Sequence, residues 1–266
     1  MLFIPGSPVL RLSDSKIPTL ATSPYVARMK RRSFLKELGV GLAGIVLAPW
    51  ADAAAAAFQR RRADFVFTRL QYTSGNWDVD QRMPSNLLHS LVEYTTIEVD
   101  TRERIVPLES EAVFDSPFCY LTGHKLVEFT TKERDHFEAY AHRGGFVFVD
   151  DCNHDIDGLF AKSFEAQMAA IFGDDALVKI PNDHLLYRAF FDFPKGPPTT
   201  SFELNGWGDD MVHDYLKAIE IDGRIAVLYS NKDYGCEWDY DYRNKRFLAQ
   251  DNTKFGVNIV LHAMLA

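Results

Sequence analysis

The sequence predicts a three-layer, flavodoxin-like α/β domain with a mainly parallel sheet and an antiparallel edge hairpin. Three observations support this fold class. From residue 64 onward, short apolar runs alternate with amphipathic stretches, which is the pattern of strands covered by helices. Late in the chain, Asp222-Gly223 separates two apolar runs and is the signal of a two-residue hairpin turn. Residues 58–266 are long enough for one sizeable core, so we expect a single domain there.

The first half of this domain is predicted as strand, helix, strand, strand. The strands are the apolar runs at 65–70, 96–99 and 118–122. Between the first two, Pro84 suits the first turn of a helix. The apolar face of that helix consists of Leu87, Leu88, Leu91 and Val92.

The second half begins with a helix whose start and stop are both marked. Thr130 and Glu133 form a capping-box pattern, and Gly144 follows as a stop before the strand at 146–149. Gly173 ends a second helix. The apolar face of this second helix consists of Phe160, Phe164, Met168 and Ile171.

The last third departs from this rhythm. Residues 195–210 hold prolines and glycines in a polar setting, so we expect a long loop. The runs at 215–221 and 224–229 are the hairpin strands on either side of Asp222-Gly223. Helical spacing returns at 253–265.

The charge of the chain excludes two classes of partner. The 266 residues carry 29 Lys and Arg against 37 Asp and Glu, and residues 1–57 hold seven of the basic but only three of the acidic side chains. The remaining domain is therefore strongly acidic and has no excess of basic groups for nucleic acid or an anionic membrane surface. Three cysteines are too few for a disulfide scaffold.

Residues 1–57 resemble a twin-arginine export signal. Arg31 and Arg32 precede Phe-Leu-Lys, and a weakly apolar stretch follows that is too short and too rich in glycine to span a membrane. Small residues from Ala53 to Ala57 offer cleavage sites, and translation could begin at Met29. We therefore expect passage through the twin-arginine translocon, a periplasmic location, and no membrane span after cleavage.

Side chains suited to chemistry follow the predicted strands. Because parallel strands end at one edge of a sheet, loops distant in sequence meet there. We call this the carboxyl edge. The segments that reach it are 71–77, 123–125, 150–155 and 231–238.

The segment 150–155 is the densest in reactive groups. Asp150, Asp151 and His154, with His124 from the neighbouring strand end, are ligand types that divalent metals favour. Their spacing matches no zinc signature, so no metal is assigned, and the alternative is that these groups cap a helix or bond to backbone amides. Adjacent residues of a strand also point to opposite faces, so Asp150 and Asp151 need a turn to enter one site.

Cys152 has two further interpretations. At a strand-to-helix turn it is placed like a nucleophile, but it lacks small flanking residues, and its acidic neighbours disfavour a thiolate. A disulfide with Cys236 is the other interpretation, since both follow strand ends and export leads to an oxidising compartment. Cys119 lies inside a strand and is expected to be a small buried residue.

An aromatic rim is a second candidate binding feature. Tyr72, Trp77, Tyr234 and Trp238 follow strand ends, with Asp233 beside them, and would suit a sugar or peptide ligand. The alternative is that these rings pack over the edge of the sheet as part of the core.

Several separated motifs resemble the bacterial family called domain of unknown function 4159. They are Arg69-Leu70-Gln71-Tyr72, Gly75-Asn76-Trp77, Leu121-Thr122-Gly123-His124, the run from Gly144 to Cys152, and Tyr234-Gly235-Cys236-Glu237-Trp238. The resemblance implies a fold similar to class I glutamine amidotransferases and no established activity. Some relatives are parts of membrane-anchored proteins associated with MoxR-type ATPases and von Willebrand A domain partners. Cys152 lacks the glycine-flanked elbow of amidotransferases and no late His-x-Glu pair is present, so glutamine hydrolysis is not expected.

We therefore expect an exported domain that binds a ligand or protein partner at the carboxyl edge, with no assigned catalysis and no cofactor. The alternative is a periplasmic hydrolase, assisted by a divalent metal, that uses His124, Asp150, Asp151 and His154.

Overall fold

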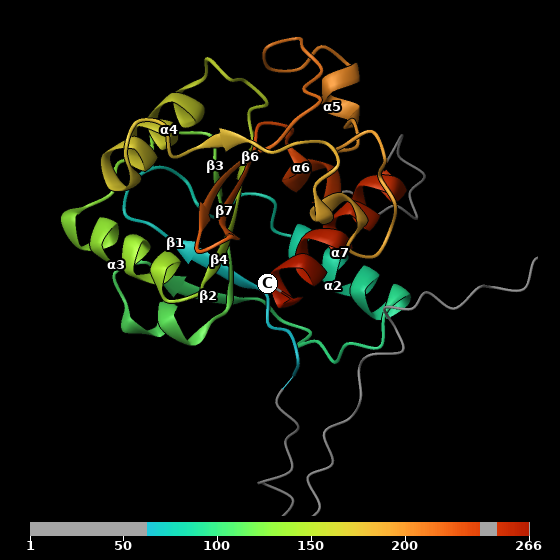
Figure 1. The fold of residues 1–266 in the computed structure, drawn as a ribbon, viewed down its shortest axis with the longest axis horizontal. Helices are drawn as coiled ribbons and strands as arrows, with labels where there is room; N and C mark the ends of the chain where they lie inside the picture. Colours follow the sequence, from blue (N-terminus) through green and yellow to red (C-terminus); the bar gives the residue numbers. More distant parts are fainter. Residues whose placement is uncertain (1–62, 240–248, 266) are drawn as a thin grey trace, which may run out of the picture. The chain divides into compact units, whose positions relative to one another are not determined.

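The structure is a computed structural model that describes residues 63–239 and 249–265. Within these residues, a sheet has the strand order β2-β1-β3-β4-β7-β6-β5 (Figure 1). Its strands are β1 (Thr68–Gln71), β2 (Arg104–Pro107), β3 (Phe118–Gly123), β4 (Phe146–Asp151), β5 (Val178–Lys179), β6 (Lys217–Ile221) and β7 (Arg224–Ser230). The pairs among β2, β1, β3, β4 and β7 are parallel, and β6 runs antiparallel to its two neighbours. The predicted fold class is confirmed.

Helices cover both faces of the sheet (Figure 1). One face packs against α2 (Met83–Tyr94), α6 (Tyr234–Asp239) and α7 (Ala249–Leu265). The other packs against α3 (Thr131–His142) and α4 (Leu159–Phe172). Shorter elements are the 3-10 helices at Glu111–Asp115 and Leu185–Arg188 and the helix α5 (Ser201–Leu204).

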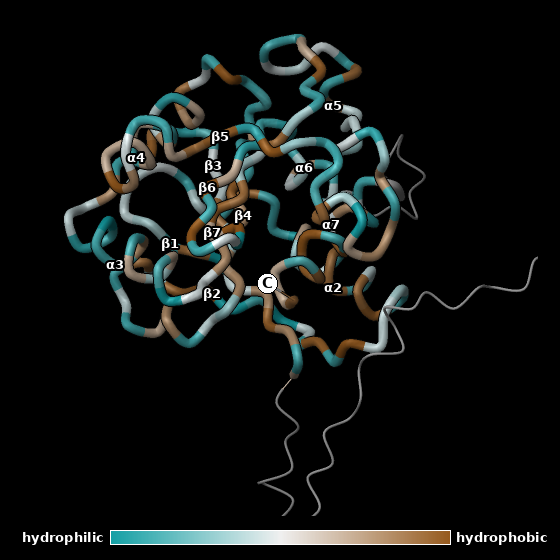
Figure 2. Tube along the Cα trace, in the orientation of Figure 1, coloured by the Kyte–Doolittle hydropathy of each residue, from teal (hydrophilic) through white to brown (hydrophobic). Residues whose placement is uncertain are grey.

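The two cores follow from alternation along the central strands. Phe146 and Phe148 of β4 lie in the core under α2 and α7, whereas Val147 and Val149 lie in the core under α3 and α4. Figure 2 shows apolar residues along β4 and β7. Because the central strands are buried on both faces, they read as continuous apolar runs in the sequence.

The predicted helix and turn signals are confirmed in detail. The side chain of Thr130 accepts a hydrogen bond from the backbone N–H of Glu133, and the Glu133 carboxylate accepts one from the N–H of Thr130. Asp222 and Gly223 have φ values of 52° and 77°, which suit the two positions of a type I′ hairpin turn.

Two sequence-based expectations are wrong. The strand beside β1 is Arg104–Pro107 and not 96–99, where Val99 makes only an isolated bridge to Phe65. This edge strand exposes most of its side chains, so it has no apolar run by which to detect it. Val92 is 56% exposed on the outer side of α2. The expected loop at 195–210 is confirmed except for the one-turn helix α5, which begins with a capping box at Thr200.

Of the helices that the structure describes, none combines the length and the apolar character needed to cross a lipid bilayer. The predicted export signal lies outside the described residues.

Candidate functional site

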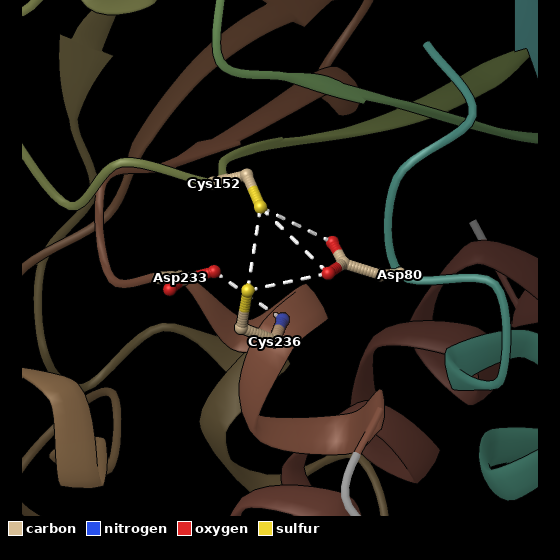
Figure 3. Close-up of side chains that lie close together, drawn as sticks. All are labelled: Asp80, Cys152, Asp233 and Cys236. Atoms are coloured by element: carbon tan, nitrogen blue, oxygen red, sulfur yellow. Dashed lines mark hydrogen bonds between the residues drawn. The ribbon is translucent and has the colours of Figure 1, made fainter. Parts of the chain in front are cut away.

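Four side chains from three segments meet at the carboxyl edge of the sheet (Figure 3). Asp80 lies in the loop between β1 and α2, Cys152 follows β4, Asp233 follows β7, and Cys236 lies in α6. One potential ligand atom from each of the four lies within 4.8 Å of those of the other three. We call these residues the thiol–carboxylate cluster.

The two sulfur atoms and the Asp80 carboxylate form the centre of the cluster. The sulfurs of Cys152 and Cys236 are 3.3 Å apart, and both cysteines are free thiols. Cys236 Sγ donates to Asp80 Oδ1 at 3.2 Å, and Cys152 Sγ donates to Asp80 Oδ2 at 3.5 Å. Figure 3 shows the Asp80 carboxylate directed at both sulfurs. One carboxylate therefore bridges two thiols from distant parts of the chain.

Asp80 is positioned by a buried arginine. Arg69 of β1 is 2% exposed and donates to the carbonyl oxygens of Val79 at 2.7 Å and Asp80 at 3.2 Å. Its Nε is paired with Glu103 at 2.8 Å. Asp80 has a φ of 54°, in the left-handed region that aspartate tolerates better than most residues. The guanidinium group thus fixes a turn of the main chain that directs Asp80 toward the sulfurs.

Asp233 starts the helix that carries Cys236. Its φ is 56°, and its Oδ1 accepts a hydrogen bond from Cys236 N at 3.2 Å, as a residue at a helix N-terminus does. Its Oδ2 is buried and has no hydrogen-bond partner among the described residues. A buried acceptor without a partner is costly, so this oxygen has unused capacity to accept a hydrogen bond or to contact a cation.

A glycine makes room for this arrangement. At Gly235 an added Cβ atom would overlap Asp80 Oδ2 and would lie 2.6 Å from the hydroxyl of Tyr120. The backbone N–H of Gly235 donates to Asp150 Oδ2 at 2.6 Å. Asp150 Oδ1 and the Tyr120 hydroxyl are also buried without partners in the described part of the chain.

The pKa is raised for three of the four groups of the cluster, Asp80, Asp233 and Cys152. Burial raises the pKa of Asp80, although hydrogen bonds from Cys236 and Cys152 act in the opposite direction. The pKa of Asp233 is raised well above its ordinary value, mainly by burial and secondly by the charge of the neighbouring Cys236. The hydrogen bond with Cys236, followed by burial, raises the pKa of the Cys152 thiol. Burial also raises the pKa of Asp150 behind the cluster to about 8. A cation would favour the ionised form of each group.

The donor set fits a thiophilic metal ion. Thiolates favour Zn²⁺ and other soft or borderline ions, whereas Mg²⁺ and Ca²⁺ favour sites made of oxygen atoms alone. In a tetrahedral zinc site with Zn–S bonds of about 2.3 Å, the sulfurs lie roughly 3.8 Å apart. The observed 3.3 Å is about 0.5 Å shorter, so the two sulfurs would move apart by that amount to hold one ion. Two sulfurs and two carboxylates fill a tetrahedral shell.

The four residues of the predicted hydrolase site do not come together. Asp150 faces Gly235, while Asp151 accepts from Asn153 N and from Asn231 Nδ2. The alternation of side chains along β4 sends the two carboxylates to different surroundings. Within the described ranges, no three of His124, Asp150, Asp151 and His154 form a group that could hold one metal ion.

The two histidines have separate surroundings. The Nδ1 atom of His124 is 2.9 Å from the side-chain Nδ2 of Asn76, from which it accepts. His154 is buried, with Nδ1 2.6 Å from Asn231 O and Nε2 2.8 Å from Met211 O. Main-chain carbonyl oxygens therefore lie against both ring nitrogens of His154, and Asp209 Oδ1 lies 3.5 Å from Nε2.

The predicted aromatic rim is wrong for three of its four rings. Tyr72, Tyr234 and Trp238 are at most 1% exposed. Tyr234 stacks on Trp238 with ring centroids 5.4 Å apart, and Trp238 Nε1 donates to Asn252 O of α7. Trp77 is half-buried against the core. The packing interpretation is correct for these three rings: Tyr234 and Trp238 pack with α7, and Tyr72 packs on Phe129 in the core of the other face.

Sequence reasoning missed one member of the cluster and a second buried group. Asp80 lies three residues beyond the segment chosen from the first strand end, and no local motif marks it. The second group is His154, Asp209 and His213, in which Asp209 Oδ2 is 2.8 Å from His213 Nε2. Asp209 lies in the stretch expected to be a loop, and no motif in that stretch indicates that its carboxylate contacts the two histidines.

Comparison with protein-family models gives one match, over residues 66–264, to the family described as domain of unknown function (DUF4159). No curated protein matches the chain.

Proposed function

The chain belongs to the DUF4159 family, and we propose that its function is to bind a thiophilic metal ion, Zn²⁺ in the first place, at the thiol–carboxylate cluster. The observation that carries the proposal is the meeting of two thiols and two carboxylates within 4.8 Å. The Oδ2 atom of Asp233 is buried and has no hydrogen-bond partner among the described residues, so this carboxylate has acceptor capacity to spare. Zinc binds with deprotonated thiol ligands, so binding would release protons held by the cluster.

The proposed ion has a structural role at the edge of the sheet. Four protein ligands complete a tetrahedral shell, which is typical of structural zinc sites, whereas catalytic sites keep one position open. The ligands come from the loop after β1, the end of β4 and the start of α6. A bound ion would therefore link three segments and stabilise the surface at which we propose that a ligand or protein partner binds.

We also propose that this domain works after export to the periplasm through the twin-arginine translocon. The supporting observation is the Arg31-Arg32 pair before Phe34-Leu35-Lys36, followed by a weakly apolar stretch. The metal proposal stands on the geometry of the cluster and does not depend on this route.

The metal content of the purified full chain tests the proposal. After dialysis against metal-free buffer, elemental analysis should find about one zinc per chain in the wild-type protein. The Cys152→Ser, Cys236→Ser double variant should lose the zinc. Cys119→Ala is the matched control, because this buried β3 cysteine is not part of the cluster, and its zinc content should equal that of wild type. Wild-type protein that binds no zinc even when titrated in reducing buffer would overturn the proposal.

A further inference from the structure

The Cys152–Cys236 pair has the geometry for a second chemistry. We propose that these two thiols form a reversible disulfide by exchange with an external disulfide, and that the exchange begins at Cys236. The sulfurs are 3.3 Å apart, although 84 positions separate the two residues. A disulfide bond is about 2.05 Å long, so the sulfurs need to approach by only about 1.3 Å.

The different exposure of the two cysteines sets the order of events. Cys152 is 2% exposed at the end of β4, whereas Cys236 is partly exposed in α6. A bulky disulfide can therefore reach Cys236 before it can reach Cys152. Cys236 is the entry thiol, and Cys152 is the resolving thiol behind it.

Each step of the exchange balances. The Cys236 thiol loses its proton and attacks one sulfur of the external disulfide, which forms a mixed disulfide and expels one thiolate. The Cys152 thiol then loses its proton and attacks Cys236 Sγ, which forms the internal disulfide and expels a second thiolate. The protein is oxidised by two electrons, the external disulfide is reduced to two thiols, and the two protons pass to those thiols.

Asp80 holds the two thiols beside each other. Its carboxylate lies 3.2 Å from Cys236 Sγ and 3.5 Å from Cys152 Sγ. One carboxylate in contact with both sulfurs keeps them at the short separation from which the disulfide can form.

Oxidation and metal binding exclude each other. The internal disulfide removes both thiolate ligands, so the oxidised cluster keeps only Asp80 and Asp233. This last step rests on the proposed metal function, whereas disulfide formation itself does not. The pair would then release the metal under oxidising conditions and bind it again on reduction.

The test is a redox titration of the full chain, first reduced and stripped of metal with a chelator. Samples equilibrate in buffers of reduced and oxidised glutathione and are quenched in acid. They are then denatured and alkylated, and mass spectrometry measures the mass of the intact protein. The reduced chain should carry three alkyl groups, one on each of its three cysteines. The oxidised chain should carry one, on Cys119, and its mass should be lower by two hydrogens before alkylation.

Single-cysteine variants test the order of attack. Cys152→Ser should accumulate glutathione bound to Cys236, and Cys236→Ser should take up glutathione at least 10-fold more slowly. The reverse pattern, or three alkyl groups on wild type at the most oxidising ratio, would overturn the proposal. The wild-type titration needs no variant, so it stands even if a serine variant fails to fold.

A zinc titration of the reduced and the oxidised chain separates the two proposals. Zinc bound by the reduced chain and lost from the oxidised chain supports both. A disulfide that forms in a reduced chain unable to bind zinc rejects the metal function alone. Zinc binding without any disulfide rejects the redox proposal alone.

Discussion

The sulfur of Cys236 lies 3.2 Å from a carboxylate oxygen of Asp80, although 156 positions separate these residues in the chain. The contact joins the loop after β1 to α6. It also places the thiol and the carboxylate where one metal ion would bind both.

We expect Asp80→Asn to weaken zinc binding by more than the roughly 10- to 100-fold that loss of an outer partner of a metal site costs. Asparagine keeps the shape of the side chain but lacks its negative charge. A competition titration against a chromophoric chelator measures the change. Asp78→Asn is the matched control, since Asp78 is exposed in the same loop, and its affinity should equal that of wild type. Equal weakening by both variants would show that Asp80 acts only through general charge.

Gly235→Ala should impair the cluster by steric overlap. The added methyl group would overlap Asp80 Oδ2 and crowd the hydroxyl of Tyr120, so the carboxylate must move away from the sulfurs. We expect at least a 10-fold loss of zinc affinity and a cost of about 1–3 kcal/mol in the free energy of unfolding, as for other overpacked sites. Isothermal titration and urea denaturation measure the two effects. Unchanged zinc affinity would contradict the position assigned to Asp80.

Much of the fold could be predicted because the central strands and the helix ends carry local signals. Phe146 and Phe148 alternate with Val147 and Val149, and both faces of that strand are buried, so a continuous apolar run marks it. The strand at Arg104–Pro107 escaped prediction because an edge strand needs few apolar side chains. Its pairing with β1 depends on backbone hydrogen bonds that any sequence can make.

The candidate site could be predicted only in part, for a similar reason. Cys152, Asp233 and Cys236 follow strands that the sequence reveals, so the rule of the carboxyl edge selects their segments. Asp80 is brought to them by the contacts of Arg69 with the carbonyl oxygens of Val79 and Asp80. Such a tertiary contact leaves no periodicity or motif in the sequence.

Acid should destabilise the domain through His262. Burial, and next the neighbouring His184, lower the pKa of His262 from 6.5 to about 4 in the folded state. The unfolded chain therefore binds more protons between these values, and stability falls as the pH drops from about 6.5 toward 4. Because the ring is partly exposed, we expect a loss of about 1–2 kcal/mol. His262→Gln should reduce this loss, as measured by urea denaturation at pH 7 and pH 4.5. An identical acid loss in the variant would assign the effect to other groups.

Export should depend on the arginine pair. Replacing Arg31 and Arg32 with lysine should keep most of the protein in the cytoplasm, because the translocation machinery recognises the arginine pair. Cell fractionation followed by immunoblotting measures the distribution. Replacing Arg60 and Arg61 with lysine is the control, since these arginines lie outside the signal and are present from either start, and the distribution should match wild type. A periplasmic yield unchanged by the double replacement would contradict the proposed route.

His154 should prove to be a structural residue. Its two ring nitrogens lie 2.6 Å and 2.8 Å from the carbonyl oxygens of Asn231 and Met211, so it ties the end of β7 to the segment at 209–211. His154→Ala would leave two buried carbonyl groups without partners and a cavity in their place. We expect a loss of about 2–4 kcal/mol in the free energy of unfolding, comparable with Phe148→Ala in β4.

Zinc binding distinguishes this role from a role as metal ligand. His154 is outside the thiol–carboxylate cluster, so the folded fraction of His154→Ala should still bind one zinc per chain. Urea denaturation and zinc titration on the same preparation give both results. A stable His154→Ala protein that binds no zinc would instead place the imidazole in the metal site. That result would restore part of the hydrolase interpretation, because the histidine would then be available for chemistry at the carboxyl edge.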